Sequence, residues 1–282
     1  MAQLTAFIKQ ALAVIMAAIA AIGGLFAGTP SVAEGDISLV NEYSYTLDDG
    51  IAFGQGITTD GTYFYGFGAL KVAAYCGITK IDAKTGEIVK AVNYCIPKDL
   101  MLKGYSHLGD GSYYNGKLYI ACEDFGFRNP AILVYDAETL DFVEYHVVPK
   151  GVLSDEHIPW CVVNNGIVYI SEFDNVSEIK MLKFDDFSYL GSLKIDKTLN
   201  KIQGGDIYNG VLYLSSDDGD KLKPTYAVDL MTGHVEVSFV RGTGKVNTEA
   251  EGLAVYPFEN GSLFHITDVG TSVTIRSYAP TK

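Results

Sequence analysis

Hydrophobic and polar residues alternate along most of the chain, in short stretches separated by turns. Five segments share one pattern: a strand start, an Asx-Gly pair, and a second strand of alternating bulky residues. Asx-Gly is typical of a two-residue hairpin turn in which both central residues have positive φ. The pattern therefore predicts a hairpin at each pair, at Asp60–Gly61, Asn115–Gly116, Asn165–Gly166, Asn209–Gly210 and Asn260–Gly261.

A second hairpin signal follows the first four pairs. These turns read Asp82–Gly86, Asp136–Leu140, Asp185–Phe187 and Asp229–Gly233. Two hairpins make a four-stranded unit, and the aligned unit starts at 56, 111, 161, 205 and 252 lie 44 to 55 residues apart. This spacing is about the length of a propeller blade. We expect an all-β, five-bladed β-propeller of four-stranded blades; a β-sandwich of meandering hairpins is the alternative.

The last unit reaches Lys282 after only three predicted strands. Residues Ile37–Tyr45 alternate and precede the first blade, so they are the candidate for the missing strand. Closing the ring in this way removes the exposed edges of an open sheet. The sequence therefore predicts that the N-terminal strand pairs with the final blade.

The first 33 residues differ from the rest because they contain no acid and one base, Lys9. An apolar run over 11–28 and the small residues Ser31 and Ala33 are typical of a signal peptide. We expect residues 1–33 to be a signal peptide, residues 34–282 to be the propeller domain, and the mature protein to be secreted, periplasmic or on the cell surface. The alternative is a retained N-terminal anchor, which would place the protein at a membrane.

Charge limits the partners of the chain. Its 21 Lys and Arg face 34 Asp and Glu, which gives a formal charge of −13. Proteins that bind nucleic acids carry a basic face, so no nucleic acid is expected as a partner.

The four cysteines predict two bridges in an exported chain. Cys76 and Cys95 lie symmetrically about the Asp82–Gly86 turn and would face each other across a hairpin. Cys122 and Cys161 would then join neighbouring units. Four buried thiols are the alternative.

A functional site in a propeller usually lies where the inner strands begin and the second strands end. Those positions supply His107 and His157 together with seven site candidates, Gln55, Asp110, Trp160, Gln203, Glu251, Glu123 and Asp217. The collected carboxylates predict a face that binds a small polar or cationic ligand, a peptide or calcium. The alternative is that these acidic loops are merely solvated.

Four short motifs resemble those of the five-bladed propeller form of glutaminyl cyclotransferase, and the likeness covers nearly all of residues 40–280. Phe53–Ile57 is similar to the family's Phe-Thr-Gln-Gly-Leu, and Leu108–Gly111 to its Phe-Gly-Glu-Gly. Pro159–Cys161 aligns with the family's Gly-Trp-Gly, and Gln203–Asp206 aligns with its Asn-Glu-Leu-Glu. The resemblance implies formation of N-terminal pyroglutamate with loss of ammonia, with Asp110 as the proton shuttle.

The chain also departs from that family. Tyr65 replaces a family glutamate, while Glu123 and Asp217 replace two pocket tryptophans. Carboxylates cannot replace ring faces in packing, so these changes favour a more polar or cationic ligand. We therefore expect a propeller that binds a ligand without catalysis. The alternatives are a cyclotransferase-like enzyme with Asp110 as its acid, and a surface scaffold anchored by residues 1–28.

Overall fold

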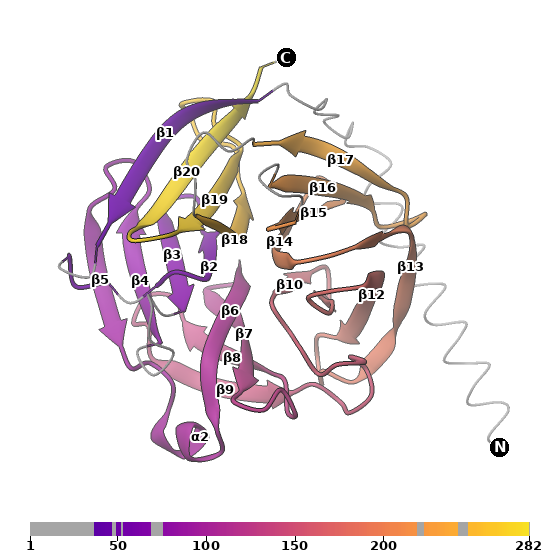
Figure 1. Cartoon of the computed structure of the whole chain (residues 1–282). Helices are drawn as coiled ribbons and strands as arrows, with labels where there is room; N and C mark the ends of the chain where they lie inside the picture. Colours follow the sequence, from indigo (N-terminus) through magenta and orange to yellow (C-terminus); the bar gives the residue numbers. More distant parts are fainter. Residues whose placement is uncertain are drawn as a thin grey trace, which may run out of the picture.

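The structure is a computed structural model that describes residues 37–46, 49–51, 53–68, 76–218, 223–241 and 248–281. Within these ranges the strands form five antiparallel four-stranded sheets arranged radially around one axis (Figure 1). The predicted five-bladed propeller is confirmed. The proposed signal peptide at residues 1–33 lies outside the described residues. In the described ranges, no helix is both long and apolar enough to cross a membrane.

Each blade runs from an inner strand at the axis to an outer edge strand. Blade 1 holds β2 (Gly56–Thr59), β3 (Tyr63–Gly68), β4 (Gly77–Asp82) and β5 (Ile88–Asn93). Blade 2 holds β6 (Tyr105–Tyr114), β7 (Lys117–Asp124), β8 (Ala131–Asp136) and β9 (Phe142–Val147). Blade 3 holds β10 (Cys161–Asn164), β11 (Ile167–Ile170), β12 (Val176–Lys183) and β13 (Tyr189–Leu199).

The last two blades follow the same order. Blade 4 holds β14 (Ile202–Tyr208), β15 (Val211–Ser216), β16 (Pro224–Asp229) and β17 (Val235–Val240). Blade 5 holds β18 (Glu249–Val255), β19 (Phe264–Val269), β20 (Val273–Pro280) and, at its outer edge, β1 (Ile37–Tyr45). A short helix that the pattern did not predict, α2 (Lys98–Leu102), lies between blades 1 and 2.

The first hairpin turns form mostly as the Asx-Gly pairs predict. Asn115, Asn165 and Asn209 have φ of 48° to 49°, and the glycines that follow them have φ of 78° to 79°. At the other two pairs only the glycine, Gly61 or Gly261, has positive φ. The prediction for both central residues was wrong there. At the first of these, the Asp60 carboxylate instead accepts the backbone N–H groups of Thr62 and Tyr63 at 2.8 Å each.

Apolar side chains fill the spaces between blades. The buried hydrophobic residues separate into clusters that each draw from two neighbouring blades, for example Phe67, Ile78, Leu108 and Leu133 from blades 1 and 2. Successive side chains of a strand point to opposite faces of the blade, so each face presents apolar side chains to a neighbouring blade. Stability therefore depends on each blade having a neighbour on both sides.

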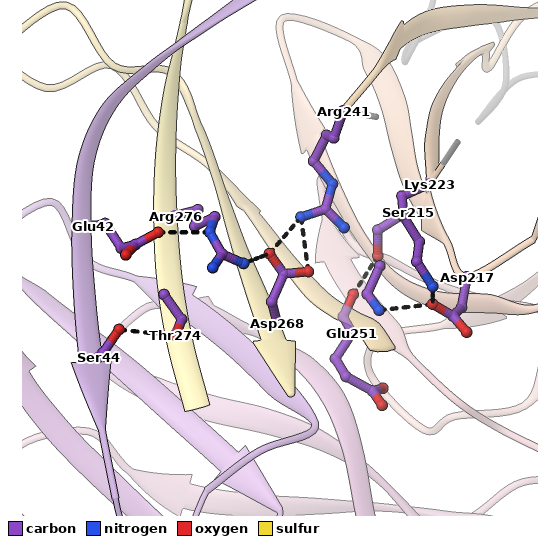
Figure 2. Close-up of polar contacts among 11 residues, drawn as sticks. Glu42, Ser44, Ser215, Asp217, Lys223, Arg241, Glu251, Asp268, Thr274 and Arg276 are labelled. Atoms are coloured by element: carbon purple, nitrogen blue, oxygen red, sulfur yellow. Dashed lines mark hydrogen bonds and ion pairs between the residues drawn. The ribbon is translucent and has the colours of Figure 1, made fainter. Parts of the chain in front are cut away.

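The N-terminal strand closes the ring, as predicted. Strand β1 pairs antiparallel with β20 from Ile37 opposite Pro280 to Tyr45 opposite Val273. An ion network reinforces this joint (Figure 2): Arg276 Nε donates to Glu42 Oε2 at 2.7 Å, and its Nη1 contacts Asp268. Arg241 Nη1 reaches both oxygens of Asp268 at 2.8 and 2.9 Å. Because Arg241 and Asp268 are buried, this pairing is largely protected from salt screening.

The predicted disulfides are not formed: all four cysteines are described, and each is a buried thiol that is not joined to another cysteine. Cys76 and Cys95 do lie at the end of the β4–β5 hairpin, where Cys95 N–H donates to Cys76 O at 3.0 Å. The Cys76 thiol donates instead to Ser106 O at 3.0 Å. Cys122 and Cys161 belong to different hydrophobic clusters, because Cys122 on blade 2 faces blade 1, whereas Cys161 on blade 3 faces blade 2.

Candidate functional site

The axis of the propeller is held by the carboxylate of Asp110, on the inner strand of blade 2. Its Oδ1 accepts Ile57 N–H at 2.8 Å, and its Oδ2 accepts the N–H groups of Gly205 at 3.0 Å and Leu253 at 3.1 Å. Its own N–H donates to Pro159 O at 2.8 Å. Because these four partners belong to blades 1, 4 and 5 and to the chain entering blade 3, one residue links all five blades.

Glycines let the inner strands approach this carboxylate. A Cβ on Gly56, Gly204 or Gly252 would lie 2.6 to 2.8 Å from an oxygen of Asp110, closer than side-chain carbons approach in real structures. These three glycines therefore allow close packing of the inner strands at the axis. Asp110 has no exposed surface, because the inner strands that donate hydrogen bonds to it also enclose it.

The electrostatics of Asp110 follow from this enclosure. Burial raises its pKa well above the ordinary value, and the backbone N–H groups of Ile57, Leu253, Gly111 and Gly205 act in the opposite direction. A carboxylate that is buried and saturated by main-chain donors is typical of a structural group. The residue predicted to shuttle protons therefore does not face solvent.

A second carboxylate, Glu123 at the end of β7, lies between two histidines. Its Oε2 is 2.9 Å from His107 Nδ1, and its Oε1 is 3.1 Å from His157 Nε2 and accepts Ile158 N–H at 2.7 Å. Glu123 is 1% exposed, whereas the side chains of His107 and His157 are 37% and 26% exposed. The structure thus places a buried acid behind two rings that reach the surface.

These contacts set the charge of the cluster. Burial alone would raise the pKa of Glu123, but hydrogen bonds from His107 and His157 outweigh it and lower this pKa. Burial lowers the pKa of His157, and its bond to Glu123 outweighs that effect and raises it. Glu123 is therefore held as a carboxylate, and protonated His157 is its favoured partner.

Gln55 joins this cluster to blade 5. Its Oε1 is 3.1 Å from His107 Nε2, and its main-chain O accepts Gly252 N–H at 2.7 Å. The residue before Gly252 is Glu251, which is 2% exposed. Burial, followed by repulsion from Glu249, raises the pKa of Glu251 well above its ordinary value.

We call the surface formed by His107, Glu123, His157, Gln55 and Glu251 the mouth cluster. Its members come from the ends of inner and second strands, as the propeller pattern predicts. Two aromatic side chains that sequence reasoning left out of the site, Phe127 and Phe173, lie against its His157 ring. The His157 ring is 4.7 Å from the Phe127 ring and 5.2 Å from that of Phe173. The sequence signal for them was their position beside the acidic loop residues.

The remaining site candidates lie elsewhere. Trp160 has no exposed surface, and its Nε1–H donates to Ser171 Oγ at 3.0 Å, so the indole is part of the core between blades 3 and 4. Gln203 is half-buried on β14. Asp217 forms an ion pair with Lys223 and accepts Ala250 N–H at 2.8 Å (Figure 2). Asp217 therefore supports the start of β18, two residues from the mouth cluster at Glu251.

Metal binding has no support from the geometry of the described residues. Within them, no group of three or more His, Cys, Asp or Glu side chains is arranged to hold a metal ion. Part of the acidic loop that motivated calcium, residues 219–222, lies outside the described ranges. Calcium therefore stays an untested prediction.

The fold and site define a five-bladed propeller with a buried axial carboxylate and an acidic, histidine-containing mouth. No protein-family model and no curated protein matches this sequence. Among solved structures, the chain is similar to the crystal structure of Myxococcus xanthus glutaminyl cyclase, with a TM-score of 0.59 over 86% of this chain and 96% of that one. The identity is 14%, so the resemblance to glutaminyl cyclotransferase is confirmed for the fold, and the reaction is not implied.

Proposed function

We propose that the protein binds a small ligand carrying an ammonium group at the mouth cluster and does not catalyse a reaction through Asp110. One observation carries the proposal: the carboxyl of Glu251 is 2% exposed, and burial together with repulsion from Glu249 raises its pKa well above the ordinary value. Two acids in this arrangement repel each other once both are ionised. An ammonium would stabilise them with charge-assisted hydrogen bonds.

The neighbours of Glu251 fit the same ligand. Gln55 connects the main chain beside Glu251 to His107, and its side-chain amide can bond to the polar part of a peptide or amine. The ring faces of Phe127 and Phe173 offer apolar surface at the opposite side of the cluster. The formal charge of −13 adds long-range attraction for a cation.

Calorimetry with triglycine amide tests this proposal, because its only charged group is an ammonium. Binding should release a proton from Glu251, so the observed heat should depend on the ionisation enthalpy of the buffer. Affinity should rise with pH up to about 8, where the peptide's own ammonium begins to lose its proton, since a cation prefers ionised Glu251 and the pKa of Glu251 is raised.

The matched pair of variants is Glu251→Gln and Glu259→Gln, the second lying in the exposed turn at the other end of the same hairpin. Glu251→Gln should weaken binding about tenfold or more and remove the proton release. Glu259→Gln should behave as the wild type. Equal affinity in all three proteins would refute the ammonium site.

A glutaminyl cyclotransferase is the second candidate, and the fold shared with the Myxococcus xanthus enzyme favours it. Its test is mass spectrometry of glutamine-started peptides incubated with the wild-type protein. Ammonia loss above the spontaneous rate would contradict the non-catalytic proposal. The wild type is the decisive sample, because Asp110→Asn would place an amide donor against backbone N–H groups and destabilise the axis.

We also propose that the protein is exported and that residues 1–33 are removed. The leader composition supports this proposal. The intact mass of protein recovered outside the producing cell tests it: a chain that begins at Glu34 is expected. A full-length mass in the membrane fraction would instead indicate a retained anchor and favour the scaffold alternative.

A further inference from the structure

An apolar cavity of about 250 Å³ opens beside the mouth cluster, between blades 1 and 2. It does not belong to the polar site described above. Its lining consists of Cys76, Tyr94, Ile96, Met101, Tyr105, Ser106 and Phe125. These residues come from the end of β5, from α2, and from the adjoining ends of β6 and β7.

The cavity and the mouth cluster are continuous along one pair of strands. Tyr105 and Ser106 immediately precede His107 on β6, and Phe125 follows Glu123 by two residues at the end of β7. The two strands stay connected past the sheet, because Phe125 N–H donates to Gly104 O at 3.0 Å. The cavity therefore adjoins the part of the mouth cluster that His107 and Glu123 form.

The size of the cavity limits what it can hold. An apolar cavity of roughly 150 Å³ is enough for benzene, whereas pockets that take whole drug-sized ligands span roughly 300–1,000 Å³. The cavity of about 250 Å³ lies between these limits. It fits one compact apolar group, such as an isobutyl or phenyl group, and not a complete ligand.

The rim of the cavity leaves apolar surface in contact with water. Phe125 is 88% exposed, Tyr94 58% and Met101 43%. Exposed apolar surface that is grouped around a cavity is typical of a binding site. Covering these three side chains with an apolar group would add hydrophobic stabilisation to the complex.

We infer that the ligand is amphipathic, and that a single apolar side chain next to its polar group occupies this cavity. The inference rests on the proposed function, because the polar part of the same ligand is held by the mouth cluster. It adds the class of ligand: a short peptide or an amine with one compact apolar group.

Four peptide amides test the inference: triglycine amide, and the same peptide with leucine at the first, second or third position. Affinities are measured by calorimetry with the wild-type protein. At least one leucine peptide should bind about tenfold or more tightly than triglycine amide, as expected for the burial of one leucine side chain. The position that gives the gain reports the spacing between the ammonium and the cavity.

Two variants of helix α2 provide the matched control. Met101→Ala removes a lining residue, whereas Leu102→Ala removes its neighbour, which is 81% exposed and does not line the cavity. Met101→Ala should reduce the leucine gain by about threefold or more and leave triglycine amide unchanged. Leu102→Ala should leave both affinities unchanged.

The outcomes separate the two proposals. Binding of triglycine amide with no gain from any leucine peptide would overturn the apolar subsite and leave the ammonium site standing. A gain that Met101→Ala does not reduce would also overturn the subsite. If none of the four peptides binds, the proposed function and this inference both fail.

Discussion

Asp110 and the mouth cluster place buried carboxylates in opposite situations. The carboxyl of Asp110 accepts hydrogen bonds from main-chain N–H groups of several blades, whereas Glu123 is paired with histidine side chains and Glu251 is repelled by another acid. Main-chain donors are fixed by the fold, so the first arrangement stabilises the ring itself. Side-chain partners can be exchanged for a ligand, so the second arrangement can respond to binding. Burial of an acid alone does not distinguish the two roles; its partners do.

The largest expected effect belongs to Asp110→Ala. It leaves the N–H groups of Ile57, Gly205 and Leu253 buried without acceptors, at about 1–3 kcal/mol each. The free energy of unfolding should fall by more than about 3 kcal/mol, measured by denaturant titration. Asp136→Ala is the control, because Asp136 also accepts two N–H groups but in an exposed turn. Equal losses in both variants would contradict the axial role.

Glu123→Gln should lower the stability of the fold by an intermediate amount that depends on pH. The lowered pKa of Glu123 gives stability that is present above its ordinary value of 4.5 and lost as pH falls through its folded-state pKa. The raised pKa of His157 gives stability that is present below 6.5 and lost as pH rises through its folded-state pKa.

The difference in Tm between wild type and Glu123→Gln should therefore be greatest between pH 4.5 and 6.5. Thermal unfolding across a pH series measures it. The control is Glu138→Gln, which removes an exposed acid paired with Lys80. A Tm difference that stays constant with pH would argue against the ionic link between Glu123 and His157.

Cys76→Ser tests the thiols, which lie outside both regions. Denatured wild-type protein should react as four free thiols and the variant as three. The loss of stability should be about 1–2 kcal/mol, the cost of placing a hydroxyl in a buried apolar site. If the denatured wild type shows two reactive thiols or none, one or both of the predicted disulfides form after all.

The smallest effect is expected for Glu251→Gln. The pKa of Glu251 is raised, so its ionisation opposes folding and wild-type stability should decline as pH rises above the ordinary value of 4.5. The variant removes this decline, and its Tm should match or slightly exceed that of the wild type at pH 8. A marked loss of stability would instead give Glu251 a structural role like that of Asp110.

Much of the fold was accessible from the sequence because it repeats. Asx-Gly pairs, Asp-initiated turns and regular spacing give five blades, and the alternating residues of Ile37–Tyr45 give the closing strand. Helix α2 was missed because it is only five residues long and lacks a side-chain cap. The prediction of disulfide bridges was wrong. Symmetry about a turn brings the main chains of two cysteines together, but it does not determine in which direction each thiol points.

The site was accessible only in part. Strand ends predict that Gln55, Glu123 and Glu251 gather at one face, but not which of them touch. His107 and His157 are 50 residues apart and have no metal-ligand spacing, and they meet only because both reach the carboxylate of Glu123. For Asp110 the sequence predicted a solvent-facing acid. Its enclosure depends on the close approach of the main chain at Gly56, Gly204 and Gly252, which sequence patterns do not give.

The pairing of β1 with β20 also determines when during folding the ring of blades can close. The first described strand pairs with the last described strand, so ring closure has a very long sequence separation and should be slow. Until then the last blade has an unpaired edge that invites intermolecular association. A growing chain of this kind must be kept apart from its copies until β20 has been made. Closure of the ring is therefore expected only after β20 has emerged.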